Sequence, residues 1–97
     1  MPKGYWIAHV SVEDPDLYEN YKTAARPVFE RYGAKFIVRG GESTQAEGQC
    51  RPRTVVIEFD SYADALECYQ SAEYQAARTH RTSTSTGDLI VIEGNDA

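Results

Sequence analysis

Alternate positions along the chain separate into an apolar set and a mixed set in four stretches, and this period-two pattern predicts four β-strands. The first stretch covers residues 4–12 and the second covers residues 35–39. Residues 53–60 form the third, which is rich in β-branched and aromatic side chains and is therefore typical of a central strand. Residues 89–93 supply the fourth strand, before a short C-terminal tail.

Two longer stretches repeat apolar residues at the spacing of a helix. The first begins after Asp14, a suitable N-cap that precedes a proline, and its apolar stripe continues to Gly33. Pro27 lies inside this helix and predicts a kink or short break, because proline cannot donate the backbone hydrogen bond. The second stretch begins at Ser61 and is predicted as two helical pieces, the later one over residues 73–81.

The order strand, helix, strand, strand, helix, strand predicts an α+β domain of the ferredoxin-like βαββαβ type. Its usual form is a four-stranded antiparallel sheet with the helices on one face. Residues 1–97 are long enough for a single domain of this kind with one core. The polar residues 42–51 are interpreted as part of a hairpin connection, and residues 82–87 as a loop.

Side-chain parity assigns each strand residue to one face of this sheet. The helices are predicted to cover an apolar set: Trp6, Ala8, Val10, Phe36, Val38, Val55, Ile57 and Phe59. The open face receives a mixed set: Tyr5, Ile7, His9, Ile37, Arg39, Val56 and Glu58. An open face this apolar favours burial by a second copy, so we expect a homodimer through that face, with two sheets stacked as a dimeric α/β barrel.

The charge of the chain argues against two classes of partner. Its formal net charge is −5, whereas nucleic acids and anionic membrane surfaces both select basic patches. The first residues lack the apolar core of a signal peptide, and no run is long enough to cross a bilayer. We therefore expect a cytoplasmic protein with no nucleic-acid partner and no membrane partner.

The motifs favour neither a cofactor nor a metal. Gly40 and Gly41 lead into a hairpin and lack the lysine or third glycine of a phosphate-binding loop. The two histidines and two cysteines show no metal-ligand spacing. Cys50 and Cys68 lie far apart without a CxxC pair and are expected to be reduced, partly buried thiols.

Three polar side chains alternate onto the predicted open face: His9, Arg39 and Glu58. Because the first and third strands are neighbours in this fold, His9 and Glu58 are candidates for a catalytic proton-transfer pair, and Arg39 for holding an anionic group. The alternative is structural. Arg39 and Glu58 would then form an ion pair that fixes the register between sheets, with His9 hydrogen-bonded beside it.

A second candidate group lies on the helical piece over residues 73–81. Tyr74, Arg78 and Arg81 fall on one side of it, where Tyr74 and Arg78 would contribute to ligand binding at the mouth of a cleft. The alternative is that Tyr74 packs on the sheet while the arginines are solvated or paired with local acids.

Four phrases occur in order over nearly the whole chain: GYWIAHVSVEDP, YGAKFIVRGGE, RPRTVVIEF and YQSAEYQAAR. Together they resemble the bacterial domain-of-unknown-function family 1330, which is similar to the dimeric α/β-barrel superfamily. The resemblance implies the fold described above, in a superfamily that includes cofactor-independent monooxygenases, isomerases and lyases. The positions that match the family pattern are Arg39, Gly40, Gly41, Glu58, Tyr74 and Arg78, whereas members often carry tryptophan in place of Cys50 and Cys68.

These observations lead to two functional hypotheses. In the first, each subunit binds a small organic, anionic molecule in a polar pocket between sheet and helices, with cofactor-free acid/base chemistry by His9 and Glu58 as an alternative use of the site. In the second, the protein is a non-enzymatic dimeric interaction module whose polar residues only specify assembly.

Overall fold

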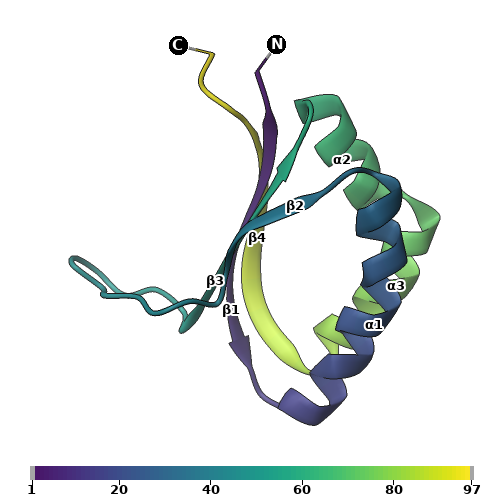
Figure 1. Ribbon diagram of the computed structural model, residues 1–97. Coiled ribbons are helices and arrows are strands. Elements are labelled where there is room, and N and C mark those ends of the chain that lie inside the picture. Colours follow the sequence, from purple (N-terminus) through teal and green to yellow (C-terminus); the bar gives the residue numbers. More distant parts are fainter. Residues whose placement is uncertain (1, 97) are drawn as a thin grey trace.

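The computed structural model describes residues 2–96, in which four strands and three helices form two layers (Figure 1). In chain order the elements are β1 (Gly4–Val12), α1 (Pro15–Arg31), β2 (Lys35–Arg39), β3 (Arg53–Phe59), α2 (Tyr62–Gln70), α3 (Ala72–Thr82) and β4 (Ser85–Glu93). The strands form one antiparallel sheet in the order β2-β3-β1-β4, and the helices cover one of its faces. The predicted α+β, ferredoxin-like fold is confirmed.

The predicted cap determines where α1 begins. The Asp14 carboxylate accepts a hydrogen bond from the Leu17 backbone N–H at 3.1 Å, which satisfies one of the free donors of the first turn. The helix then runs without a break through Pro27, so the short break that was one of the two predicted outcomes is wrong. Pro27 lies on the exposed side of α1, while the buried stripe faces inward.

A single serine divides the second helical stretch into α2 and α3. Ser71 ends α2 by donating its hydroxyl proton to the Cys68 carbonyl at 2.8 Å, and begins α3 by accepting from the Tyr74 N–H at 3.1 Å. The same residue is therefore the C-cap of one helix and the N-cap of the next. This arrangement places Cys68 and Tyr74 on the inner side, and both are fully buried.

The last strand is longer than the sequence predicts. β4 begins at Ser85, inside the stretch that was expected to be a loop, and pairs with β1 from Val12 back to Gly4. Long-range pairing therefore overrides the turn-like composition of this segment. Gly87 is required within it because a side chain there would meet the His9 carbonyl and the Val10 backbone.

A bulge in β2 changes which of its residues face the helices. Phe36 pairs with Ile57, but Val38 pairs with Val56 rather than continuing in register, so one extra residue, Ile37, is accommodated between them. Val38 therefore lies on the open face and is 41% exposed, contrary to its predicted place under the helices. Arg39 pairs with Val55 and therefore lies on the helix-covered face, whereas parity predicted it on the open face.

The core is centred on the single tryptophan. Trp6 is 1% exposed and its indole N–H donates to the Ala65 carbonyl at 2.8 Å. Its ring contacts four other aromatic rings with centroids 4.8–5.7 Å apart: Phe29, Phe59, Tyr69 and Tyr74. Three of these pairs are T-shaped, so that the edge of one ring points at the face of the other, which is a favourable arrangement.

Candidate functional site

A cavity of about 270 Å³ lies between the sheet and α1. It exists because α1 packs mainly against α3, whereas α2 makes most of the helix contacts with the sheet. The space under α1 is therefore not closed by backbone packing, and side chains from both layers line it. A more open hollow beside it shares four lining residues: Val10, Tyr18, Lys22 and Arg53.

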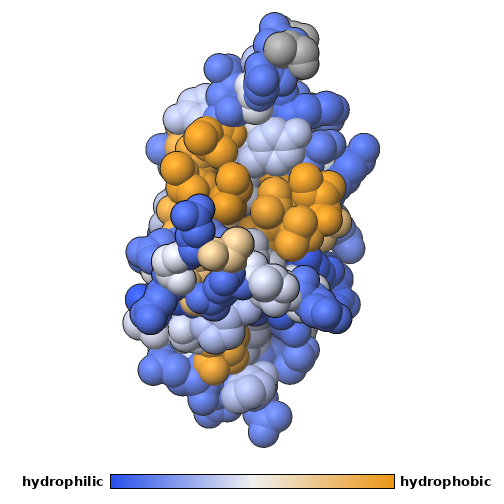
Figure 2. Space-filling view, turned by 90° about the vertical axis from the view of Figure 1, so that its left-hand side faces the viewer, coloured by the Kyte–Doolittle hydropathy of each residue, from blue (hydrophilic) through white to orange (hydrophobic). Residues whose placement is uncertain are grey.

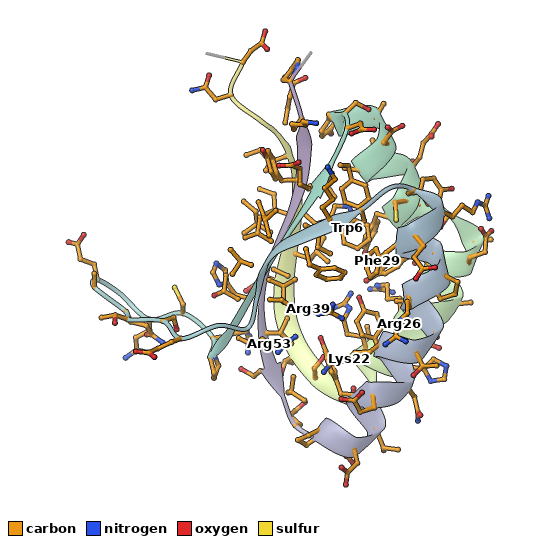
Figure 3. All side chains as sticks on the ribbon, in the orientation of Figure 1. Trp6, Lys22, Arg26, Phe29, Arg39 and Arg53 are labelled. Atoms are coloured by element: carbon orange, nitrogen blue, oxygen red, sulfur yellow. The ribbon has the colours of Figure 1, made fainter. Side chains whose placement is uncertain are left out.

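The cavity lining combines apolar walls with an unusual concentration of positive charge. The aromatic residues are Trp6, Tyr18, Tyr21, Phe29 and Phe36, and the aliphatic residues are Ala8, Val10, Ala34, Val55, Ile57 and Leu89. The cations are Lys22, Arg26, Arg39, Arg53 and Arg81, against one acid, Glu30. Figure 3 shows Lys22 and Arg26 on α1 opposite Arg39 and Arg53 on the sheet, with Trp6 and Phe29 above them in this view.

The cations of the cavity are held by aromatic and backbone surfaces more than by acids. Arg39 stacks its guanidinium over the Phe36 ring at 4.1 Å from the centroid, and Arg53 packs its guanidinium against the backbone of Gly40. Within residues 2–96, Lys22 is the one cation of the five with a carboxylate in ion-pair range, that of Glu19 at 3.1 Å. The buried Nε atom of Arg53 has no hydrogen-bond partner in the described chain.

Tyr21 and Arg81 line the inner end of the cavity, where α1 meets α3, and the Tyr74 hydroxyl lies behind Tyr21. Tyr21 and Tyr74 share a hydrogen bond of 2.9 Å, and Arg81 lies 5.8 Å from the centre of the Tyr21 ring. Burial raises the pKa of Tyr21, and the neighbouring Tyr74 raises it further. Burial also raises the pKa of Tyr74, although the Arg81 charge acts in the opposite direction. Both hydroxyls are therefore protonated at neutral pH.

We expect the free energy of unfolding to fall as the pH rises above about 10, the ordinary pKa of tyrosine. Tyr21 and Tyr74 hold their protons more tightly in the folded chain than in the unfolded chain, so their contribution is complete below that pH and declines above it. Each group contributes a slope of about 1.4 kcal/mol per pH unit. Urea unfolding between about pH 8 and about pH 11 should give a shallower slope for Tyr21→Phe than for wild type. Equal slopes would contradict this assignment.

The structure separates the predicted proton-transfer pair. His9 pairs with Thr54 and Asp88 on the neighbouring strands, and its Nδ1 lies 3.1 Å from the Thr54 hydroxyl. Glu58 pairs with Tyr5, whose hydroxyl donates to it at 3.4 Å. Four positions along the strand, about 13 Å, therefore separate His9 from Glu58, which is too far for proton transfer.

The predicted ion pair between Arg39 and Glu58 is also wrong. The bulge in β2 places Arg39 in the cavity, while Glu58 stays on the open face beside Tyr5 and Lys35. The two side chains therefore lie on opposite faces of the sheet. No ion pair among residues 2–96 joins them.

The structure also separates the members of the second predicted group, Tyr74, Arg78 and Arg81. Tyr74 is 0% exposed and packs against Trp6 in the core, so it lies behind the cavity wall rather than at an entrance. Arg78 is half-buried and lies outside the cavity lining, whereas Arg81 is part of it. Sequence reasoning missed Lys22, Arg26 and Arg53.

The two cysteines lie outside the cavity lining, one exposed and one buried. Cys68 is fully buried and burial raises the pKa of its thiol to about 12, while Cys50 is exposed in the loop between β2 and β3. Among residues 2–96, no cluster of three or more histidine, cysteine or acidic side chains is arranged to hold a metal ion. The helices of the same range include none that is long and apolar enough to span a membrane.

The open face of the sheet carries a continuous apolar row. Figure 2 shows this face, with apolar side chains gathered over one half of it. One row of paired residues crosses all four strands: Val38, Val56, Ile7 and Ile90. Ile37 and Ile92 extend the patch, and both are more than two-fifths exposed. In Figure 1 the loop of residues 40–52 projects from the sheet on this side, away from the helices.

One family model and several solved structures match the chain. A family model described as "Domain of unknown function (DUF1330)" matches residues 3–95. The curated proteins contain no match. Among solved structures, the protein of unknown function RPA0582 from Rhodopseudomonas palustris superposes with a TM-score of 0.76 at 22% identity, covering 99% of this chain and 85% of that one.

Two further structures share the fold at lower identity. SnoaB, a cofactor-independent oxygenase from Streptomyces nogalater, has a TM-score of 0.65 at 10% identity, covering 100% of this chain and 97% of its own. A dimeric protein of unknown function with a ferredoxin-like fold from Bacteroides fragilis has a TM-score of 0.59 at 14% identity, covering 94% and 95%. At these identities the likeness concerns the fold.

Proposed function

The chain belongs to the DUF1330 family, and we propose that it binds a small organic anion in the cavity between its sheet and α1. The observation that carries this proposal is the charge of the cavity. Five of the ten lysines and arginines line it with a single acid, although acids outnumber bases by fifteen to ten in the chain as a whole. Positive charge gathered in a concave, low-dielectric space selects an anion.

The walls indicate what the rest of the ligand is like. Trp6, Phe29 and Phe36 line the cavity, with the Phe29 ring in contact with the other two, and offer aromatic surface to a planar or apolar body. Arg39 and Arg53 approach from the sheet with planar guanidinium groups that suit the paired oxygens of a carboxylate. A volume of about 270 Å³ suits a compound of one or two rings. An aromatic carboxylate is the simplest molecule with these properties.

Binding is better supported than acid/base catalysis. Of the residues that line the cavity, Glu30 is the one carboxylate and none is a histidine, while Tyr21 has a raised pKa and is a proton donor. Abstraction of a proton would need a base in reach of the ligand. His9 and Glu58 cannot supply it because both lie on the other face of the sheet.

The apolar row on the open face supports the further proposal that two copies assemble through it. A patch of this kind is rarely left exposed in a monomer, and a self-complementary face is what a two-fold dimer requires. The Bacteroides fragilis protein that shares the fold is described as dimeric. In such a dimer the two cavities lie on the outer sides of the stacked sheets.

Native mass spectrometry of freshly purified protein tests both parts of the proposal. We expect a species of two chains of 10.9 kDa that retains a small acidic molecule, released when the protein is unfolded. Because Trp6 lines the cavity, its fluorescence should also respond to added benzoate. Chains without a retained molecule, together with no response to benzoate, would overturn the proposal.

Gly40→Ala is expected to weaken benzoate binding more than Gly33→Ala. Both glycines have a positive φ, 67° and 68°, so each substitution costs about 1–2 kcal/mol of folding stability through backbone strain. A side chain at position 40 would meet the Arg53 guanidinium, whereas a side chain at position 33 would have no other atom within 4 Å of its Cβ. Calorimetric titration with benzoate measures the difference, and equal affinities in the two variants would show that the Arg53 position is not important for binding.

A further inference from the structure

The inner end of the cavity combines a buried hydrogen-bond donor that the described chain does not satisfy with a hydroxyl group that can donate to a ligand. Tyr21 is 9% exposed and lines the cavity, and its hydroxyl lies 2.9 Å from the hydroxyl of Tyr74 behind it. Arg81 lines the same end, and its buried Nε–H has no partner within residues 2–96. A buried donor without an acceptor is costly, so the Arg81 Nε–H marks a place where a ligand atom fits.

Either hydroxyl of the tyrosine pair can be the donor in their hydrogen bond. When Tyr74 donates to the Tyr21 oxygen, the proton of Tyr21 is free to point into the cavity, which Tyr21 lines. A ligand acceptor beside Tyr21 would select this arrangement, because both hydroxyl protons are then hydrogen-bonded.

These donors lie toward the β4 side of the cavity, whereas Arg39 enters it from β2 on the other side. One row of paired residues forms part of the floor and crosses the whole sheet: Arg39, Val55, Ala8 and Leu89. Arg39 begins the row on β2 and Leu89 ends it on β4, three strand spacings or about 14 Å away. Tyr21 and Arg81 belong to the seam between α1 and α3, and α3 packs on β4.

We infer that the ligand of this cavity has oxygen at both ends: an anionic group held by Arg39 and Arg53, and a hydrogen-bond acceptor such as a carbonyl oxygen held by Tyr21 and Arg81. This inference rests on the proposed binding of an organic anion and specifies its class as an aromatic carboxylate that carries an oxo substituent distant from the carboxylate. A hydrocarbon substituent at that position would leave the buried Arg81 Nε–H without a partner and could not accept a hydrogen bond from Tyr21, so it should bind less tightly.

Two benzoates of nearly equal shape test the inference. 4-Acetylbenzoate and 4-isopropylbenzoate carry the same carboxylate, but only the first has a carbonyl oxygen at the far end. Calorimetric titration of the wild-type protein should give about tenfold tighter binding of the acetyl compound, the effect of one or two hydrogen bonds. In Tyr21→Phe, which keeps the ring, the preference should fall to about threefold or less, because the Arg81 N–H alone remains.

The outcomes separate the two proposals. If both compounds bind the wild-type protein equally well, the second oxygen site is disproved while the proposed anion site stands. If 4-isopropylbenzoate binds more tightly than 4-acetylbenzoate, the inner end is apolar in character and the inference is also overturned. If neither compound binds, the proposed function itself fails. The comparison in the wild-type protein does not depend on how well Tyr21→Phe folds.

Discussion

Replacing Arg39 and Arg53 together by methionine is expected to weaken benzoate binding at least hundredfold, or about 2.7 kcal/mol, as measured by calorimetric titration. The two guanidinium groups approach the cavity from neighbouring strands, and neither has a carboxylate partner within residues 2–96. Each would contribute a charge-assisted hydrogen bond to the anion. Methionine keeps the unbranched apolar stem of each side chain, so the walls of the cavity are largely preserved.

The matched control is Arg31→Met with Arg51→Met. Arg31 pairs with Glu73 and Arg51 lies near Asp88, and both arginines are exposed and outside the cavity. This variant loses the same net charge, so it measures the effect of long-range attraction alone. If the control loses as much affinity as the cavity variant, the positions of Arg39 and Arg53 do not matter and the site assignment is wrong.

Ile90→Asp is expected to convert a dimer into monomers at micromolar concentration, as measured by sedimentation velocity. Ile90 ends the apolar row that crosses the open face and is 52% exposed in the single chain. If a second sheet covers this row, the substitution buries an unpaired carboxylate at the interface, which costs several kcal/mol. The dimer dissociation constant should rise at least hundredfold.

Leu17→Asp provides the comparison for that substitution. Leu17 is also 52% exposed but lies in the first turn of α1, on the other side of the molecule. It introduces the same charge at an equally exposed apolar position and should leave the dimer intact. Equal dissociation by both variants would indicate a general effect of charge, and a wild-type protein with the mass of one chain would disprove the interface.

Alternation was sufficient to assign the faces of the two central strands. Trp6, Ala8 and Val10 are buried under the helices as the pattern predicts, and the same holds for Val55 and Ile57. These strands are regular, so parity alone decides which face a side chain occupies. Arg53 has the same parity as Val55, so its place on the covered face was also present in the pattern and only its role was missed.

The sequence prediction failed on the register between β1 and β3 and on the bulge in β2. Parity places His9 and Glu58 on one face but says nothing about which residues lie opposite each other, and the register sets them four positions apart. The bulge in β2 has no clear signal in five residues, yet it exchanges the faces of Val38 and Arg39. The predicted site was therefore assembled from residues that the fold separates.

The cavity itself arises from packing that no local pattern specifies. The stripe of α1 predicts a buried side, but whether that side meets the sheet directly or leaves a space depends on how α1 and α3 pack together. Lys22 and Arg26 lie at the edge of the stripe, where either solvent or a ligand can surround them. Their importance becomes visible only when Arg39, Arg53 and Arg81 are seen to share the same space.

A crystal structure of the protein grown with benzoate shows directly whether the cavity binds an organic anion. We expect density for the compound between α1 and the sheet, with its ring beside Trp6 and Phe29 and its carboxylate within hydrogen-bond distance of Arg39 or Arg53. A cavity closed by its own side chains at saturating benzoate, or benzoate bound only elsewhere on the molecule, would contradict it.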